Sequence, residues 1–312
     1  MKKCVIVGNC QQNPIKFLLR SVDSFNRSYR IVDVEPIHMW NMDNINNFIH
    51  QYNDADIIFT QPIFDAKFGI ANTSNMIEFN NGAKKIPIII FPNIDFIGFT
   101  PFTTRIPVRT DKTFTPDAHH GIVLWCYING YDRDKTINVC NEFQRNESHA
   151  DLYKTIFDIA LKRLENVEML LHMDANVSFL FRNKYMDEKL MLNRLHPSNV
   201  VYTFIANRLL STLSIYDKVI TPKREFTVTD EIPISNAIKN ALGIKFDDDE
   251  CFYYLGYLFS LSEYVTTLYS FYGENGPTVE AAVKMNEEKL KTIGGIIASN
   301  YNGLDITALF RW

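Results

Sequence analysis

The chain has 312 residues, of which 46% are hydrophobic and 13% aromatic, and its formal net charge at pH 7 is −4. This amount of apolar material excludes an intrinsically disordered chain, and the length allows one enlarged α/β domain or two domains. The near balance of charges excludes a general electrostatic attraction to nucleic acid or to anionic lipid.

The first part of the chain contains short apolar runs that predict the buried strands of a parallel sheet. Cys4 to Val7 is the first of them and ends at Gly8, which predicts a central strand followed by a tight turn. In the helix after this turn we expect Asn13 as the N-terminal cap and Pro14 at the first helical position. A helical stretch at 43–51 separates further apolar runs, which predict strands at 31–34, 56–60, 86–91 and 122–128. This alternation is typical of a doubly wound, mainly parallel α/β sheet, whose ligands bind at the carboxyl ends of the strands.

Beyond about residue 130 the apolar residues recur at helical spacing, which predicts a helical second half. We expect helices at 152–171, 177–189, 199–215 and about 278–297. Ser198 is a suitable N-cap for the third, and this places His196 and Pro197 on the loop that leads into it. We therefore divide the chain into an α/β core, a helical part that carries the His-Pro motif and completes the site, and a mixed, mostly helical C-terminal region, at 1–130, 131–220 and 221–312.

The turn Gly8-Asn9-Cys10-Gln11 presents a cysteine where a strand passes into a helix. Backbone N–H groups and the helix dipole favour a thiolate and a developing oxyanion there, which makes Cys10 a candidate nucleophile. The alternative is that Cys10 is only a small residue in a tight turn. Gln61 and Asn93 follow neighbouring strands, and their amides are either oxyanion donors or turn formers. A single glycine in the turn excludes the dinucleotide fingerprint, and no phosphate-binding P-loop motif follows a strand.

A nucleophilic cysteine needs a base, and His196 is the best placed of the seven histidines because it lies in a polar loop that Pro197 restricts. A structural role for this histidine is the alternative. Asn193 or Asp187 could orient the imidazole, since an amide oxygen can accept a hydrogen bond from the ring N–H. The pair His119-His120 either contributes to a site or caps a strand, and it is a poor metal site because adjacent residues on an extended chain face opposite ways.

Charge and cysteine patterns add three further expectations. The basic stretch that includes Arg182, Lys189 and Arg194 suits phosphate or carboxylate recognition if it faces the site, and is otherwise a solvated helix face. Five cysteines without a CxxC spacing argue against a disulfide framework and a structural zinc site, so we expect no metal and a cytoplasmic location. No apolar stretch approaches the roughly 20 residues that span a bilayer, and we expect no membrane span.

These motifs, in this order, resemble the WcbI-type polysaccharide-biosynthesis proteins, which are associated with capsule assembly in bacteria. One block of the resemblance is Val5 to Gln11, with Pro14 and a leucine-bearing helix after it. The second block runs from Ala175 through His196-Pro197-Ser198-Asn199 to Asn207, and the segments 56–63 and 91–94 fall between the two blocks. The resemblance covers roughly residues 1–215, and the segment after about 220 has no counterpart in it.

The resemblance implies an SGNH/flavodoxin-like core and a protein that binds coenzyme A, with acetyl-CoA or another acyl-CoA as donor and a sugar hydroxyl as acceptor. Cys10 then takes the place of the SGNH nucleophile and His196 that of the base, while Gln61 and Asn93 stabilise the oxyanion. The coenzyme would contact Gly8, Asn9 and Gln11 of the turn and the cations Arg182, Lys189 and Arg194. The SGNH aspartate three residues before the histidine is Asn193 here, and the nucleophilic serine is a cysteine.

Several alternatives stay open. Cys10 could be acylated and then deliver the acyl group, or His196 could activate the sugar hydroxyl for direct attack on the thioester. An SGNH-like carbohydrate esterase or deacetylase would use water as acceptor and would not consume acyl-CoA. A non-catalytic assembly protein that binds coenzyme A or a glycan would keep its function in Cys10→Ala and His196→Ala. The pattern indicates neither the acceptor sugar nor an oligomeric state.

Overall fold

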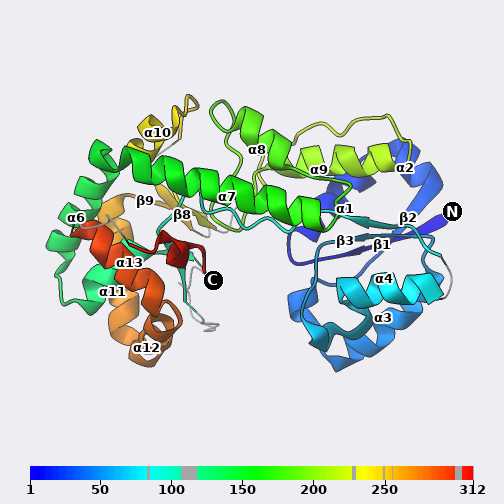
Figure 1. The fold of residues 1–312 in the computed structure, drawn as a ribbon, viewed down its shortest axis with the longest axis horizontal. Helices are drawn as coiled ribbons and strands as arrows, with labels where there is room; N and C mark the ends of the chain where they lie inside the picture. The colour runs from blue at the N-terminus through cyan, green and yellow to red at the C-terminus, as the bar shows by residue number, and fades with distance from the viewer. Residues whose placement is uncertain are drawn as a thin grey trace. The chain divides into compact units, whose positions relative to one another are not determined.

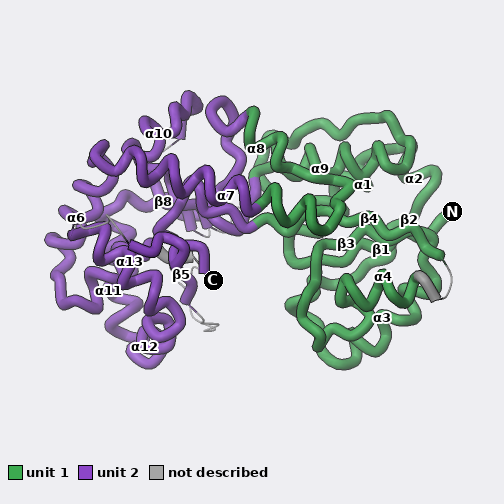
Figure 2. Tube along the Cα trace, viewed as in Figure 1, with its two compact units in different colours: residues 1–94, 164–183, 198–226 green, residues 95–163, 184–197, 227–312 purple. Residues whose placement is uncertain are grey.

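The computed structural model describes residues 1–82, 85–106, 118–226, 230–248, 250–254, 256–298 and 304–311. The chain forms two compact units, which Figure 2 colours separately. Unit 1 comprises residues 1–94, 164–183 and 198–226, and unit 2 comprises residues 95–163, 184–197 and 227–312. Each unit is therefore assembled from three separate segments of chain, which differs from the three consecutive parts predicted from the sequence.

Unit 1 is built on a four-stranded parallel sheet with the order β2-β1-β3-β4. The strands are β1 (Lys2–Val7), β2 (Tyr29–Val32), β3 (Ile57–Thr60) and β4 (Ile88–Ile90). β1 lies between β2 and β3, and its residues from Cys4 to Val7 are fully buried. The predicted α/β class with a parallel sheet and a central first strand is thereby confirmed.

Helices cover both faces of this sheet (Figure 1). α1 (Gln12–Arg20) and α9 (Asn199–Thr212) pack together on one face, and α3 (Met42–Asp54) and α4 (Thr73–Gly82) lie on the other. β3 is buried along its length like most of β1, and burial on both faces explains the apolar runs of these two inner strands. After β1 the chain forms β2 on one side of β1, and it then crosses over to form β3 on the other side of β1. The strand order therefore reverses between β1 and β3, and sheets of this kind bind ligands at such a switch point.

Several helix boundaries of unit 1 differ from the prediction. α1 begins at Gln12, so Asn13 lies inside the helix instead of capping it. The reason is that the turn is hydrogen-bonded to the start of the helix. Gln12 N donates to Asn9 O (3.0 Å), and Asn13 N donates to Cys10 O (3.1 Å). α2 (Asp23–Ser28) follows α1, and α8 (Ser178–Lys184) ends five residues before the predicted helix does. Ser198 occupies the N-cap position of α9, as predicted, but its side chain makes no capping hydrogen bond.

Unit 2 combines small antiparallel sheets with helices. Its strands are β5 (Thr103–Arg105) and β6 (Ala118–His120) in one sheet, and β7 (Asp230–Glu231), β8 (Phe252–Tyr254) and β9 (Tyr257–Phe259) in the other. Its helices include α5 (Gly121–Ile128), α6 (Arg133–Arg145), α10 (Asn236–Leu242), α11 (Leu261–Glu274), α12 (Gly276–Met285) and α13 (Glu287–Ile297). The long helix α7 (Ala150–Leu170) contributes its residues up to 163 to unit 2 and the rest to unit 1.

Two predictions for this region are wrong. The apolar run at 122–128 forms helix α5 and not a strand, because a largely buried helix has the same uninterrupted apolar sequence as a buried strand. The predicted final helix is divided at Asn286, whose buried side chain donates to Arg105 O (2.8 Å) and Ala282 O (2.7 Å). In the part of the chain that the structure describes, we find no helix with the length and apolarity needed to cross a bilayer.

Candidate functional site

The turn at 8–11 lies at the carboxyl end of β1, beside the switch point of the sheet. Gly8 is required there because a Cβ atom at this position would lie 2.3 Å from Oε1 of Gln61. The same oxygen accepts a hydrogen bond from Asn9 N (2.8 Å), which joins the turn after β1 to the residue after β3. The sheet register and the missing side chain of Gly8 thus fix the turn that carries Cys10.

A network of side-chain amides holds the turn in place. Gln61 Nε2 donates to Gln11 Oε1 and to Pro92 O, both at 3.1 Å. Gln11 Oε1 also accepts from Ile94 N (3.1 Å), and Asn9 Nδ2 donates to Asn93 Oδ1 (2.9 Å). The structure therefore brings Gln61 and Asn93 to the turn.

Gln61 nevertheless differs from the predicted oxyanion donor. Its side chain is 1% exposed, and its NH₂ group already serves two acceptors of the protein. Within the turn, the N–H groups of Asn9, Gln11 and Gln12 also have acceptors, whereas no hydrogen bond of the Cys10 N–H is found among the described residues. The backbone N–H of Cys10 is thus available for a developing negative charge, and so is the NH₂ group of the exposed Asn93 side chain, whose oxygen accepts from Asn9.

The cysteines divide into two groups by exposure. Cys10 and Cys251 are half-buried free thiols, and the other three are buried. Burial raises the pKa of the Cys4 thiol to about 12 and that of the Cys126 thiol to about 11, and it raises the pKa of Cys140 as well. Since the thiolate is the nucleophile, these three thiols are unsuited to nucleophilic chemistry.

His196 belongs to unit 2 and ends a closed loop that Asn193 stabilises. Asn193 Oδ1 accepts from Leu195 N (2.8 Å) and from His196 N (2.9 Å), and Leu192 N donates to His196 O (2.8 Å). Because its oxygen serves two backbone donors, Asn193 cannot offer that oxygen to the imidazole, which differs from the prediction. Its Nδ2 atom lies 2.8 Å from Nδ1 of His196 instead.

A carboxylate that the sequence did not single out also faces this ring. Oδ1 of Asp230, on β7, lies 3.0 Å from Nδ1 of His196, and the backbone oxygen of Asp230 accepts from Asn193 Nδ2 (2.9 Å). Asp187, the other orienting residue considered from the sequence, is exposed and pairs with Lys245 (3.2 Å). No spacing rule connects Asp230 with His196 along the chain, so only the fold could reveal this contact.

The cations predicted to bind phosphate are held by carboxylates of the protein. Arg182 pairs with Glu165 on the surface of unit 1, and Lys189 in unit 2 contacts Glu231 and Asp248. Burial opposes the charge of Lys189, but the two carboxylates outweigh it and raise its pKa.

Arg194 is 1% exposed and binds Asp95 through two nitrogens and Phe310 O through one (3.1 Å). Lys189 and Arg194 thus both have carboxylate partners within unit 2, and their role in phosphate binding stays a prediction.

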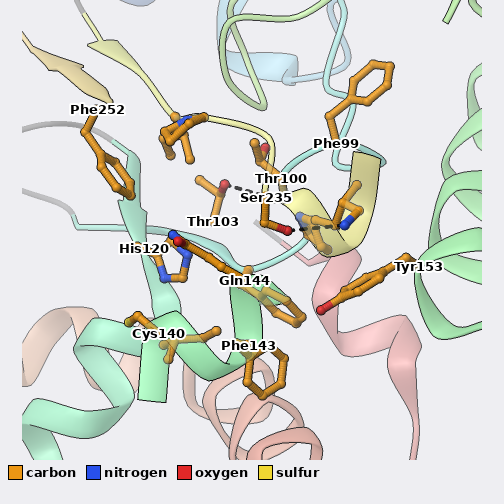
Figure 3. A pocket seen from close by; sticks show the side chains of 16 residues that line it. Phe99, Thr100, Thr103, His120, Cys140, Phe143, Gln144, Tyr153, Ser235 and Phe252 are labelled. Carbon is orange, nitrogen blue, oxygen red and sulfur yellow. Dashed lines mark hydrogen bonds between the residues drawn. The ribbon is translucent and has the colours of Figure 1, made fainter. Parts of the chain in front are cut away.

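Unit 2 also contains a small apolar pocket with a cavity volume of about 30 Å³ (Figure 3). Its walls include Phe99, Phe143, Tyr153, Phe252, His120 and Ser235. Burial lowers the pKa of His120 to about 4, so its ring is neutral at physiological pH, and its Nδ1 atom has no hydrogen-bond partner among the described residues. The side chain of His119 lies outside the described residues. Within the described ranges, no group of three or more histidine, cysteine or acidic side chains is arranged to hold a metal ion.

The sheet, its switch point and the cysteine turn define an α/β protein of the class that binds its ligand at the carboxyl edge of a parallel sheet. The family model of the polysaccharide biosynthesis enzyme WcbI matches residues 3–218. The chain belongs to this family of polysaccharide biosynthesis enzymes, which confirms the resemblance found in the sequence.

Comparison with solved structures gives the same fold. A structure of WcbI, described as a novel polysaccharide biosynthesis enzyme, superposes with a TM-score of 0.75 over 99% of this chain and 98% of that chain. The two sequences are 14% identical, so this likeness concerns the fold alone. A comparison with curated protein sequences found no significant match.

Proposed function

We propose that the protein transfers an acyl group, most simply acetyl, from acyl-CoA to a sugar hydroxyl during the synthesis of a capsular or other surface polysaccharide. The observation that carries the proposal is the position of Cys10, a half-buried free thiol at the carboxyl end of the central strand. The solved WcbI structure is described as the native protein without a disulfide bond between coenzyme A and a cysteine. That description supports a cysteine close to the coenzyme thiol in the family.

The turn suits the chemistry of a thioester. In the covalent route, Sγ of Cys10 attacks the thioester carbonyl, a bond to the acyl carbon forms, and coenzyme A departs as the thiol once its sulfur takes a proton. The sugar hydroxyl then attacks the acyl-cysteine, loses its proton to a base and releases the thiol of Cys10. In the direct route the hydroxyl attacks the thioester itself. In both routes the N–H of Cys10 would stabilise the oxyanion, and His196 as the base stays a prediction.

The nucleotide half of coenzyme A carries phosphates, and the helix that follows the cysteine turn offers two further cations for them. Lys16 and Arg20 follow Cys10 on α1 and line a groove of about 440 Å³ with Asp33 and Glu35, next to the carboxyl end of β2. Arg20 pairs with Asp33 on the surface (2.6 Å), and Lys16 Nζ donates to Val34 O. Burial lowers the pKa of Lys16 to about 8, so an incoming phosphate would favour its charged form. We place the phosphates in this groove.

The proposal is tested by calorimetric titration of coenzyme A and acetyl-CoA into the wild type, Cys10→Ser and Cys251→Ser. Mass spectrometry of each protein after mixing with acetyl-CoA then shows whether an acetyl group is attached. Cys251→Ser is the matched control, because Cys251 is the other half-buried thiol. An acetyl adduct in the wild type and the control, absent from Cys10→Ser, would establish the covalent route.

Binding without an adduct, together with loss of acetyl-CoA when a sugar acceptor is present, would establish direct transfer. Absence of binding would refute the acyltransferase proposal. Hydrolysis of sugar esters without use of acyl-CoA would identify an esterase or deacetylase, and binding without any turnover would identify an assembly protein. The rate of acyl transfer can also be compared among single and double variants of Cys10 and His196. If the double variant reacts as fast as the less active single variant, the two residues serve one reaction.

A further inference from the structure

We infer that a polar groove on unit 1 binds a non-acidic sugar residue of the acceptor glycan. The groove has a volume of about 270 Å³, and we call it the amide groove. Its walls come from the segment after β2 and from helix α3, and they consist of Asp33, Val34, Glu35, Trp40, Asn44, Asn47 and Gln51. As an acceptor site the inference rests on the proposed function, whereas sugar binding itself can be measured without acyl transfer.

One face of α3 supplies the amides of this groove, because Asn44, Asn47 and Gln51 are three and four residues apart. Asn44 uses its side-chain oxygen to accept from Asn41 N (3.0 Å). Asn47 and Gln51 make no side-chain hydrogen bond with any residue that the structure describes. An amide both donates and accepts, and so does a hydroxyl, so these two side chains match the hydroxyl groups of a sugar.

The charges in the groove select among sugars. Its described lining contains the carboxylates of Asp33 and Glu35 and neither lysine nor arginine. Asp33 pairs with Arg20 (2.6 Å), whereas the carboxylate of Glu35 has no partner among the described residues and can accept from hydroxyls. The same carboxylate would repel a uronic acid or a phosphorylated sugar. The amide groove therefore favours a sugar without acidic groups.

Trp40 gives the groove an apolar wall. Its ring packs against Phe48 and Phe68, with centroid distances of 5.2 and 6.4 Å, and its Nε1 donates to Glu35 O (2.8 Å). The indole is therefore held in place before a ligand arrives, which limits the entropy lost on binding. A sugar ring presents C–H groups between its hydroxyls, so it needs an apolar surface next to polar partners, and this groove offers both.

The amide groove is connected to the cysteine turn. Ile37 N donates to Gly8 O (2.8 Å), and Gln12 Nε2 donates to Val34 O (3.1 Å). Residues 33–35 also line the groove in which we place the phosphates of coenzyme A. One segment thus borders a groove that contains Lys16 and Arg20 and another that contains amides and carboxylates. These charges would direct the donor phosphates and the acceptor sugar to different grooves.

Sugar binding can be measured without acyl-CoA on an array of oligosaccharides from bacterial surface polysaccharides, with the fluorescently labelled full-length protein as the probe. We expect binding to non-acidic glycans in the wild type and loss of this binding in the double variant Asn47→Ala/Gln51→Ala. Asn46→Ala is the matched control and should bind as the wild type does, because Asn46 is an exposed amide on α3 outside the groove. Alanine favours a helix, so all these variants should fold, and circular dichroism checks this.

Three results on the array would overturn the inference. They are the absence of binding to any glycan, binding to acidic glycans alone, and binding that the double variant retains.

Kinetics test the role in acyl transfer. With a glycan that binds on the array as acceptor, we expect the double variant to raise KM for the glycan on the order of tenfold to a hundredfold, because two amides lose their hydrogen bonds. KM for acyl-CoA should stay unchanged. An unchanged KM for the glycan would refute the acceptor role of the groove. A wild type that binds glycans but transfers no acyl group to them would refute the proposed function instead, and the array would still establish the sugar site.

Discussion

Replacing Gly8 by alanine tests whether the packing of Gly8 against Gln61 holds the candidate site together. The added Cβ would lie 2.3 Å from Oε1 of Gln61, far inside van der Waals contact, while the backbone of Gly8 is outside the left-handed region. Gln61 must then move, although it is buried and takes part in three hydrogen bonds, to Asn9 N, Gln11 Oε1 and Pro92 O. At about 1 kcal/mol for each hydrogen bond and about 1 kcal/mol or more for overpacking, we expect Gly8→Ala to lower the free energy of unfolding by about 4 kcal/mol.

Urea unfolding followed by circular dichroism measures this change, and a double-variant cycle assigns it to the contact. In Gln61→Ala the obstructing atoms are gone, so adding Gly8→Ala should cost less than about 1 kcal/mol there. Gly273→Ala is the control, because this glycine is on helix α11 with nothing within 4 Å of its added Cβ, and it should gain up to about 1 kcal/mol. Additive effects of the substitutions at Gly8 and Gln61 would refute the reasoning.

Three further predictions concern buried or reactive side chains. Burial, together with the charge of Arg194, lowers the pKa of Lys289 to about 7, so unfolding takes up a proton between pH 7 and about 10 and the free energy of unfolding should rise with pH across this window. Urea titrations of Lys289→Met should show a smaller rise that starts only near pH 8, where Lys16 still contributes. Arg194→Met should lower the free energy of unfolding by about 3 kcal/mol, because Asp95 and the buried carbonyl of Phe310 lose their donor. Calorimetry should find the affinity for coenzyme A unchanged in this variant. A weakened affinity in folded protein would contradict a purely structural role of Arg194. Iodoacetamide followed by mass spectrometry should modify Cys10 and Cys251 well before the three buried thiols, and equal rates would disprove the assigned burial.

The parts of the fold that the sequence predicted well are those where local pattern and environment agree. Strands β1 and β3 lie inside the sheet, and their buried apolar runs between turn residues have few other interpretations. The edge strand β2 begins at Tyr29, two residues before the predicted strand, and includes the exposed Arg30. The same pattern misled at 122–128, because a largely buried helix can also lack a polar face. The interleaving of the units depends on contacts between distant segments and left no compositional boundary to detect.

The candidate site shows the same limit. The Cys10 turn is encoded locally by a strand, a glycine and a helix, and the strand ends correctly place Gln61 and Asn93 beside it. The function of each amide was not predictable, because it depends on which partner the fold brings within 3 Å. The partners of His196 and Arg194 are likewise distant in sequence, at Asp230 and Asp95.

The interleaved segments have a consequence for synthesis on the ribosome. The strands of unit 1 are complete at Ile90, but α9, which covers one face together with α1, is made only after all of 95–163 has been translated. At translation rates of about 5–20 residues per second, apolar strand surface would await its cover for roughly 5–20 s. We therefore expect a chaperone that shields apolar surface to improve the yield of folded protein. For the same reason, a fragment cut to residues 3–218 would lack the third segment of unit 2 and should aggregate when expressed alone.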